Sequence, residues 1–171
     1  FLKARLGTED ELRLWATDGT GAGRYPLTTV GQDEPMHVTK VRNGYVVVLS
    51  EWLGFFRLLH FDPETGAAFE LASSVGQPVE WKGELYFAAS DGQRGIELWK
   101  TDGSREGTRV VADVEPGRLS SGPRALLAIE RGVAFSARTF AHGNEIWLTD
   151  GTAQGTRLLV DLEPGPASSN G

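Results

Sequence analysis

Three short runs of the chain are apolar at nearly every position and are rich in β-branched or aromatic residues. They lie at residues 45–49, 85–89 and 133–137. A continuous apolar run of this length, without polar alternation, is typical of a strand that is buried on both faces. The pattern therefore predicts one fully buried strand in each of three successive segments of the chain.

Further extended segments flank these buried runs in a constant order. One precedes the run, at residues 37–41, 79–81 and 125–129, with a proline upstream (Pro35, Pro78, Pro123) and a glycine behind it. Such prolines and glycines commonly bound strands. A third segment contains tryptophan, and a fourth follows a six-residue turn, at residues 108–113 and 156–161, with weaker counterparts at 25–29 and 67–71. We therefore predict groups of four antiparallel strands.

The tryptophan segment belongs to a string that recurs along the chain. Residues 97–104 read Glu-Leu-Trp-Lys-Thr-Asp-Gly-Ser, residues 145–152 repeat the string closely, and residues 13–20 form an N-terminal copy. An eroded copy lies at residues 58–63, so the spacing between Asp18, Asp62, Asp102 and Asp150 is about 44 residues. Four short strands in every 40–45 residues are typical of the blades of a β-propeller.

The sequence thus predicts an all-β fold: a β-propeller of four-stranded antiparallel blades. We place about four blades, at residues 1–31, 32–74, 75–117 and 118–165, in a single propeller domain or fragment. Phe1 aligns with Phe87 and Phe135, so the chain begins inside a second strand and the first blade lacks its inner strand. We expect the chain to be part of a larger propeller; a four-bladed ring and a ring assembled from two chains are the alternatives.

The recurring string has a structural interpretation. Its aspartates are expected to accept backbone hydrogen bonds and close an Asx-type turn. Its threonines, Thr101 with Thr108 and Thr149 with Thr156, should face each other across the hairpin. The tryptophans are too large for one sheet to bury, so neighbouring sheets should cover them. The residues of this structural motif are Trp15, Asp18, Trp99, Asp102, Trp147 and Asp150.

Composition narrows the function without naming it. The chain has 171 residues, a net charge of −6 and no cysteine, so disulfides, thiolate metal sites and cysteine nucleophiles are excluded. An acidic balance argues against nonspecific nucleic-acid binding, and no apolar run is long enough to enter a membrane as a spanning helix. No nucleophile motif, phosphate loop or histidine-centred triad is visible, so we expect no enzyme activity and no cofactor.

The loops between the second and third strands vary most, and such loops carry ligand specificity on rigid scaffolds. Arginine, acidic and aromatic side chains there form a hypothetical site for a protein or a glycan. Its candidate residues are Trp52, Asp91, Arg94, Arg138 and His142. Each has an alternative interpretation as plain surface.

Two pairs of carboxylates are weak calcium candidates, because they lie two residues apart and hard cations prefer oxygen ligands. They are Asp113, Glu115, Asp161 and Glu163. A solvated turn before the following Pro-Gly explains them equally well. In the third strands, Glu97 and Glu145 are expected to be buried against Arg109, Arg157 or a backbone N–H, in a structural rather than a catalytic role.

The string Glu-Leu-Trp-x-Thr-Asp-Gly-Ser/Thr, followed by Gly-Thr, resembles the bacterial ELWxxDGT repeat family. The match covers residues 97–108 and 145–156 and continues into Asp-x-Glu-Pro-Gly at 113–117 and 161–165. It is partial at residues 13–20, where Arg13 replaces glutamate, and residues 45–71 depart most. The resemblance implies a large bacterial protein that is secreted or attached to the cell surface.

These observations predict a noncatalytic β-propeller repeat module of an extracellular or surface bacterial protein. It would bind a partner protein or glycan through the loops of its top face, and adhesion is one such role. Two alternatives stay open: a carbohydrate-active enzyme domain that uses carboxylates of that face, and a structural spacer in an envelope or filament assembly.

Overall fold

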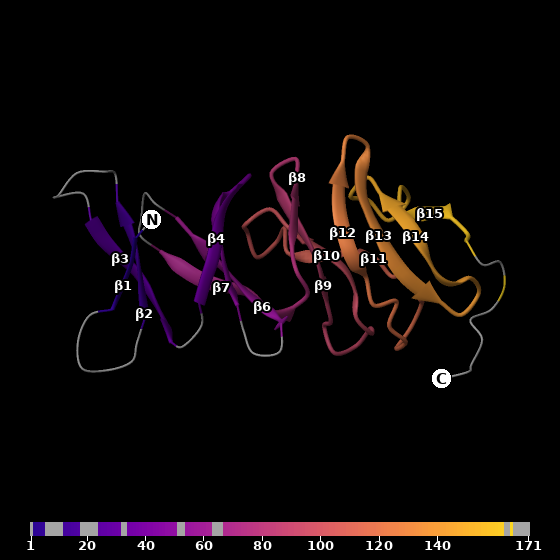
Figure 1. Ribbon diagram of the computed structural model, residues 1–171, viewed down its shortest axis with the longest axis horizontal. Coiled ribbons are helices and arrows are strands. Elements are labelled where there is room, and N and C mark those ends of the chain that lie inside the picture. Colours follow the sequence, from indigo (N-terminus) through magenta and orange to yellow (C-terminus); the bar gives the residue numbers. More distant parts are fainter. Residues whose placement is uncertain are drawn as a thin grey trace. The chain divides into compact units, whose positions relative to one another are not determined.

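The computed structural model describes residues 2–5, 12–17, 24–31, 34–50, 54–62, 67–162 and 165, with side chains from residue 38 onward. The described residues form fifteen strands. The chain divides into two compact units, Phe1–Ser74 and Val75–Gly171. Figure 1 labels the strands and colours them along the chain. In chain order the strands are β1 (Leu2–Arg5), β2 (Leu12–Thr17), β3 (Arg24–Gly31), β4 (Glu34–Val41), β5 (Gly44–Ser50), β6 (Phe56–Phe61), β7 (Ala68–Val75), β8 (Val79–Trp81), β9 (Glu84–Ala89), β10 (Glu97–Thr101), β11 (Arg109–Ala112), β12 (Arg124–Ile129), β13 (Gly132–Thr139), β14 (Gly143–Thr149) and β15 (Arg157–Val160).

The strands form four antiparallel sheets, each built from strands that are consecutive in the chain. The first sheet has the order β1-β2-β3, and the second has the order β4-β5-β6-β7. The third sheet, β8 to β11, and the fourth, β12 to β15, belong to the second unit. Three four-stranded antiparallel sheets, with almost no helix among the described residues, confirm the predicted all-β class.

Two of the three apolar runs, in β5 and β9, become strands that are buried on both faces, as predicted, whereas β13 buries Val133, Phe135 and Ala137 and leaves Ala134 and Ser136 partly exposed. In β5, Val46 and Val48 are fully buried, and in β9 Tyr86 and Phe87 are fully buried. Both strands lie in the interior of their sheets, with a partner strand on each side. Burial of the side chains on both faces explains why these runs show no polar alternation.

The register corrects two details of the sequence prediction. Trp99 pairs with Phe87 and Trp147 with Phe135, but Trp15 pairs with Leu2. Leu2, and not Phe1, therefore occupies the position of the two phenylalanines. The segment at residues 37–41 also begins earlier than predicted, because β4 starts at Glu34 and a register shift lets Pro35 lie inside the strand. A shift of this kind allows proline within a sheet.

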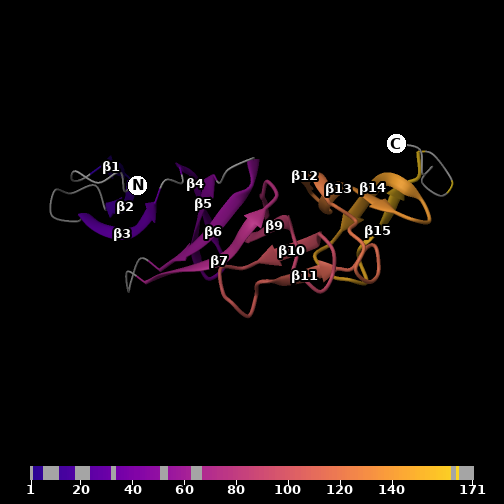
Figure 2. The ribbon, with the colours of Figure 1, turned by 90° about the horizontal axis from the view of Figure 1, so that it is seen from below.

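In the second unit, one face of the third sheet packs against the opposite face of the fourth. The core contributed by the third sheet contains Tyr86, Leu98 and Val111. Val133, Phe135 and Ala137 of β13 complete it from the fourth sheet. Figures 1 and 2 both show the strands of the third sheet beside those of the fourth. β12 lies beside β8 and β9, so the first strands of the two sheets are also neighbours. The fold of this unit is thus a stack of two sheets with an apolar core between them.

The tryptophans are covered less completely than the sequence suggested. Trp147 is half-buried and packs against the core between the third and fourth sheets. Trp99 is half-buried as well. The side chain of Trp15 lies outside the described residues. Within the part of the chain that the structure describes, smaller aromatic side chains, above all Phe135 and Tyr86, are buried more completely.

A buried polar cluster accompanies this apolar core. The Lys100 ammonium lies 3.0 Å from the Glu84 carboxylate, which also accepts a 3.0 Å hydrogen bond from the Tyr86 hydroxyl. The side chains of Lys100 and Glu84 are only 10% and 13% exposed. Burial, followed by the charge of Glu84, raises the pKa of the Tyr86 hydroxyl well above its ordinary value. Mutual pairing limits the cost of burying these charges between the sheets.

The stacking of the sheets predicts that alanine substitution destabilises the chain far more at Phe135 than at Phe140. Phe135 is 1% exposed in the core, whereas Phe140 is 75% exposed in the loop after β13. Phe135→Ala should lower the free energy of unfolding by about 3–5 kcal/mol through loss of burial and a cavity. Phe140→Ala, the matched control, should change it by about 0.5 kcal/mol or less. Urea denaturation measures both; similar small losses would mean that the sheets are not packed on each other.

Candidate functional site

The Asp-Gly-Ser turn between β10 and β11 is closed by its own side chains. Asp102 Oδ1 accepts hydrogen bonds from the Ser104 backbone N–H at 2.9 Å and from the Ser104 hydroxyl at 2.6 Å. Thr101 and Thr108 join their hydroxyls at 2.7 Å across the hairpin, as predicted. The Ser104 hydroxyl also accepts from the Gly107 N–H. The aspartate of the repeat therefore serves the turn.

The turn between β14 and β15 repeats this geometry. Asp150 Oδ1 accepts from the Thr152 N–H at 2.9 Å and from its hydroxyl at 2.7 Å. These bonds, with the hydroxyl bond as the largest influence, lower the pKa of Asp150. Thr149 and Thr156 are joined at 2.7 Å. A Cβ at Gly155 would overlap the Asp150 carboxylate, so the second glycine of the motif leaves room for the aspartate.

Glu97 at the start of β10 is a buried carboxylate that receives three hydrogen bonds. It is fully buried and accepts hydrogen bonds from the Val114 N–H, the Ser121 N–H and the Ser121 hydroxyl, at 2.9, 2.8 and 2.6 Å. The sequence left an arginine or a backbone N–H as the partner of Glu97. The structure shows backbone N–H groups in that role. Burial raises the pKa of Glu97, while the bonds from Ser121 and Val114 oppose that rise.

The repeat places a second glutamate in the same position. Glu145 is buried and accepts a hydrogen bond from the Leu162 N–H. Leu162 takes the place in the fourth sheet that Val114 takes in the third, at the same offset along the chain that separates Glu145 from Glu97. In the third and fourth sheets, the glutamate of the motif thus holds the segment that follows the last strand of the sheet.

The Glu97 network holds together one edge of the second unit, which we call the loop edge. It comprises residues 90–96, 113–123 and 140–142. The Ile96 N–H donates to the Ser120 hydroxyl at 2.9 Å, and the Gly122 N–H donates to the Ile96 carbonyl at 3.0 Å. The Arg138 N–H donates to the Ser121 carbonyl at 2.8 Å. Direct hydrogen bonds therefore brace these segments against each other and against the end of β13.

Close packing adds to this bracing. A Cβ at Gly95 would overlap the Leu119 carbonyl, so only glycine lets these two loops approach so closely. The Phe140 N–H donates to the Glu115 carboxylate at 2.8 Å and ties the last loop to the segment after β11. The loop edge is accordingly a fixed surface built on two sheets.

Two of the predicted ligand residues engage each other. Asp91 Oδ1 accepts from the Gln93 and Arg94 N–H groups, and Asp91 Oδ2 lies 2.8 Å from the Arg94 guanidinium. The two N–H bonds, with that of Arg94 the larger, lower the pKa of Asp91. Both residues are exposed, but their polar atoms already shape the loop after β9.

Two of the other predicted ligand residues, Arg138 and His142, belong to the β13–β14 hairpin. Arg138, at the end of β13, is exposed, and its neighbour Phe140 is largely exposed. His142 Nδ1 lies 3.4 Å from Asp161 Oδ2, with side chains 41% and 28% exposed. Trp52 lies outside the described residues. The structure therefore brings Arg138, Phe140 and His142 to one end of the β13–β14 hairpin.

Three of the four calcium candidates make contacts with protein groups in the loop edge or beside it. Asp113 accepts from the Gly117 N–H at 3.4 Å, Glu115 accepts from Phe140, and Asp161 faces His142. The segment after β11 turns at these residues, so Asp113 and Glu115 do not share one side of an extended strand. Glu163 lies outside the described residues. Within the described ranges, no three acidic, histidine or cysteine side chains cluster as a metal site would require.

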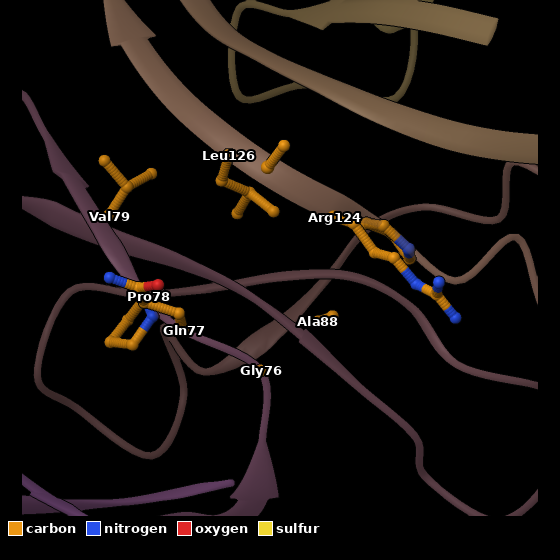
Figure 3. A pocket seen from close by; sticks show the side chains of 9 residues that line it. Gly76, Gln77, Pro78, Val79, Ala88, Arg124 and Leu126 are labelled. Atoms are coloured by element: carbon orange, nitrogen blue, oxygen red, sulfur yellow. The ribbon is translucent and has the colours of Figure 1, made fainter. Parts of the chain in front are cut away.

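A groove of about 350 Å³ opens between the first strands of the third and fourth sheets. Gly76, Gln77 and Pro78 lead into β8 on one side, and Pro123, Arg124 and Ala125 begin the other side. Figure 3 shows Arg124 at one end of the groove, away from Val79. Arg124 is exposed and pairs across the sheet with Ser136, which precedes Arg138 in β13. The groove and the exposed arginine of β13 therefore share the same edge of the fourth sheet.

Sequence reasoning missed the groove and the serine partners of Glu97. Arg124 lies just before the predicted segment 125–129 and was not singled out, because the neighbouring strand that completes the groove comes from another repeat. Ser120 and Ser121 carried a signal, since the Ser-Ser pair recurs at positions 168–169, in step with the two glutamates. The Lys100–Glu84–Tyr86 cluster had no such signal, because the fourth sheet does not repeat it.

Comparison of the chain with protein-family models, curated proteins and solved structures found no match. The described strands and loops contain no helix with the length and apolar character needed to cross a membrane. The site must therefore be interpreted from its own geometry.

The Glu97 network predicts a cost for losing one acceptor. Glu97→Gln keeps the shape but leaves one oxygen to receive three donors, so at least one buried donor loses its partner. We expect a loss of about 1–3 kcal/mol in the free energy of unfolding. Glu130→Gln, at an exposed turn position, should change it by about 0.5 kcal/mol or less. Equal stability of the two variants in urea unfolding would contradict the network.

The repeated turn predicts coupling between its glycine and its aspartate. Gly155→Ala should cost about 1–3 kcal/mol, because the new methyl group collides with the Asp150 carboxylate. The same change in an Asp150→Ala background should cost less, because the collision is gone. Gln154→Ala, at an exposed position of the turn, is the control. Identical costs of Gly155→Ala in both backgrounds, by thermal or urea unfolding, would rule out this explanation of the motif.

Proposed function

We propose that this chain is a noncatalytic β-propeller repeat module that binds a partner protein or glycan through its loop edge. Four sheets built from consecutive strands, at a repeat of about 44 residues, support the propeller assignment. The stacking of the third sheet on the fourth, face to opposite face, is the arrangement that neighbouring blades require. The resemblance to the ELWxxDGT family supports a secreted or surface location in bacteria.

The observation that carries the binding proposal is the braced loop edge with exposed cationic and aromatic groups beside it. Arg124 and Arg138 have exposed side chains here, and the Phe140 ring is largely exposed next to them. A fixed surface loses little conformational entropy on binding. Guanidinium groups form bidentate hydrogen bonds with carboxylate and sulfate-like groups, and an exposed aromatic ring packs on sugar or aliphatic surface.

The groove between β8 and β12 gives this surface a concave element. It measures about 350 Å³ and has Gln77 and Arg124 as polar groups among apolar neighbours. Concave, largely apolar sites with a few polar groups are typical of ligand recognition. A ligand with negative charge and an extended shape fits Arg124 in the groove and Arg138 beyond it.

A binding screen with matched variants tests the proposal. The chain is applied to an array of neutral and acidic glycans, and captured ligands are titrated by calorimetry. Arg124→Ala, Arg138→Ala and Phe140→Ala should each weaken binding about tenfold or more, since each removes roughly 1.4 kcal/mol or more of contact energy. Arg131→Ala is the control, because Arg131 is exposed in the β12–β13 turn at the other edge of the sheet.

The outcomes separate the functions. Binding that the three variants weaken and the control leaves intact supports the proposal. Hydrolysis of a bound glycan would instead establish the carbohydrate-active enzyme. Absence of any glycan or protein ligand, with full tolerance of alanine at all four positions, would leave the structural spacer.

A further inference from the structure

The third and fourth sheets carry equivalent residues at one constant offset along the chain, the offset that separates Asp102 from Asp150. This offset allows one face of the third sheet to be compared with the same face of the fourth. On the third sheet that face is covered by the fourth, and Leu98 and Val111 are buried there. Val79, Trp81 and Val114 pack against the same core and are partly buried.

The equivalent face of the fourth sheet has the same apolar character, but its residues on β12, on β15 and after β15 are exposed, while Leu148 in β14 is 5% exposed. Leu127, in the place of Val79, is 60% exposed, and Ile129, in the place of Trp81, is 36% exposed. Leu159 and Leu162, in the places of Val111 and Val114, are 45% and 67% exposed. Register places Leu127 opposite Ala134 and Ile129 opposite Gly132, so these residues share one face. We call this set, Leu127, Ile129, Leu159 and Leu162, the open face.

The middle of the open face lacks the ion pair of its covered counterpart, and at its loop end Ser136 and Arg138 stand where the covered face has Ala88 and Ser90. At the equivalent positions of the fourth sheet, Leu148 and Gly132 replace Lys100 and Glu84, and Ala134 replaces Tyr86. An apolar patch of this kind on a protein surface marks an interaction site. Its occupant need not satisfy a buried ion pair.

The residues that cover the equivalent face of the third sheet indicate which side chains an occupant of the open face would need. The fourth sheet covers it with Phe135 and Trp147, which pair across β13 and β14, and with Ala137 two residues further. In the first sheet, Trp15 pairs with Leu2, and Ala4 follows two residues further. The first sheet therefore carries Leu2, Ala4 and Trp15 at the register positions of Phe135, Ala137 and Trp147.

We propose that the open face binds the first sheet of a second copy of this chain, head to tail. The contact continues the interface already formed between the third and fourth sheets, and it does not rest on the proposed ligand binding. Closure on the first sheet of the same chain would give a ring of four sheets, the smallest number usual for a propeller. A contact between copies does not fix the number of sheets at four, because a heterologous interface generates either a larger ring or an open chain of copies.

Self-association of the whole chain is the first test. Sedimentation equilibrium across a range of concentrations should show a mass that rises above the monomer. Leu127→Glu and Leu159→Glu place a charge on the open face and should weaken association about tenfold or more. Gln154→Glu, at an exposed position of the β14–β15 turn, should leave it unchanged. A monomer at every concentration, or association that the open-face variants do not alter, overturns the proposal.

Cysteine cross-linking identifies the two surfaces, on a background that contains no cysteine. A Leu127→Cys chain mixed with an Ala4→Cys chain should give a disulfide-linked heterodimer on mild oxidation. Homodimers of Leu127→Cys alone would show open face against open face, and a chain carrying both substitutions that closes on itself would show an intramolecular contact. Either of these results as the main product overturns the head-to-tail pairing.

Discussion

The packing of one sheet face on the opposite face of the next is the interaction on which the second unit depends. A four-stranded sheet with apolar residues on both faces cannot exist alone in water, because each face loses free energy in proportion to its exposed apolar area. Tyr86 and Leu98 on one sheet, with Phe135 on the other, remove that area from water. The repeat follows from this constraint, since each sheet must present one face that covers and one face that is covered.

The polar part of the repeat serves the same packing. Asp102 and Asp150 close turns through hydrogen bonds to nearby residues, so the strands they join can end abruptly at the sheet boundary. Glu97 acts over a longer range, because its buried carboxylate gathers donors from the segment that leads into the fourth sheet. A buried carboxylate is costly unless its oxygens are bonded. The requirement for three donors therefore fixes where the chain must run between the sheets.

Much of the fold could be predicted from the sequence, because apolar runs and turn residues act locally. The buried runs became β5, β9 and β13, and the threonine pair of each complete turn forms the expected hydrogen bond. The burial of Glu97 was also predictable from its place in a strand. Register was less accessible: Leu2, and not Phe1, pairs with Trp15, because this pair is one residue further apart in the chain than Phe87 and Trp99 or Phe135 and Trp147, whereas the prediction assumed two.

The candidate site was harder to predict, because it depends on contacts between repeats. Asp91 and Arg94 resembled free ligand groups in the sequence, but a tight loop brings them together as a pair. The groove beside Arg124 exists only where β8 and β12 approach each other. Neither a residue type nor a spacing within one repeat specifies such a contact.

The contact between Tyr86 and Gly151 tests the stacking of sheets most directly. The Tyr86 hydroxyl lies so close to Gly151 that a Cβ at that glycine would overlap it, and Gly151 follows a strand of the other sheet. Nuclear Overhauser spectroscopy on the folded chain should show cross-peaks between the Tyr86 ring protons and the Gly151 Hα protons. A Tyr86 ring that contacts only its own sheet and exchanges freely with solvent would contradict the account.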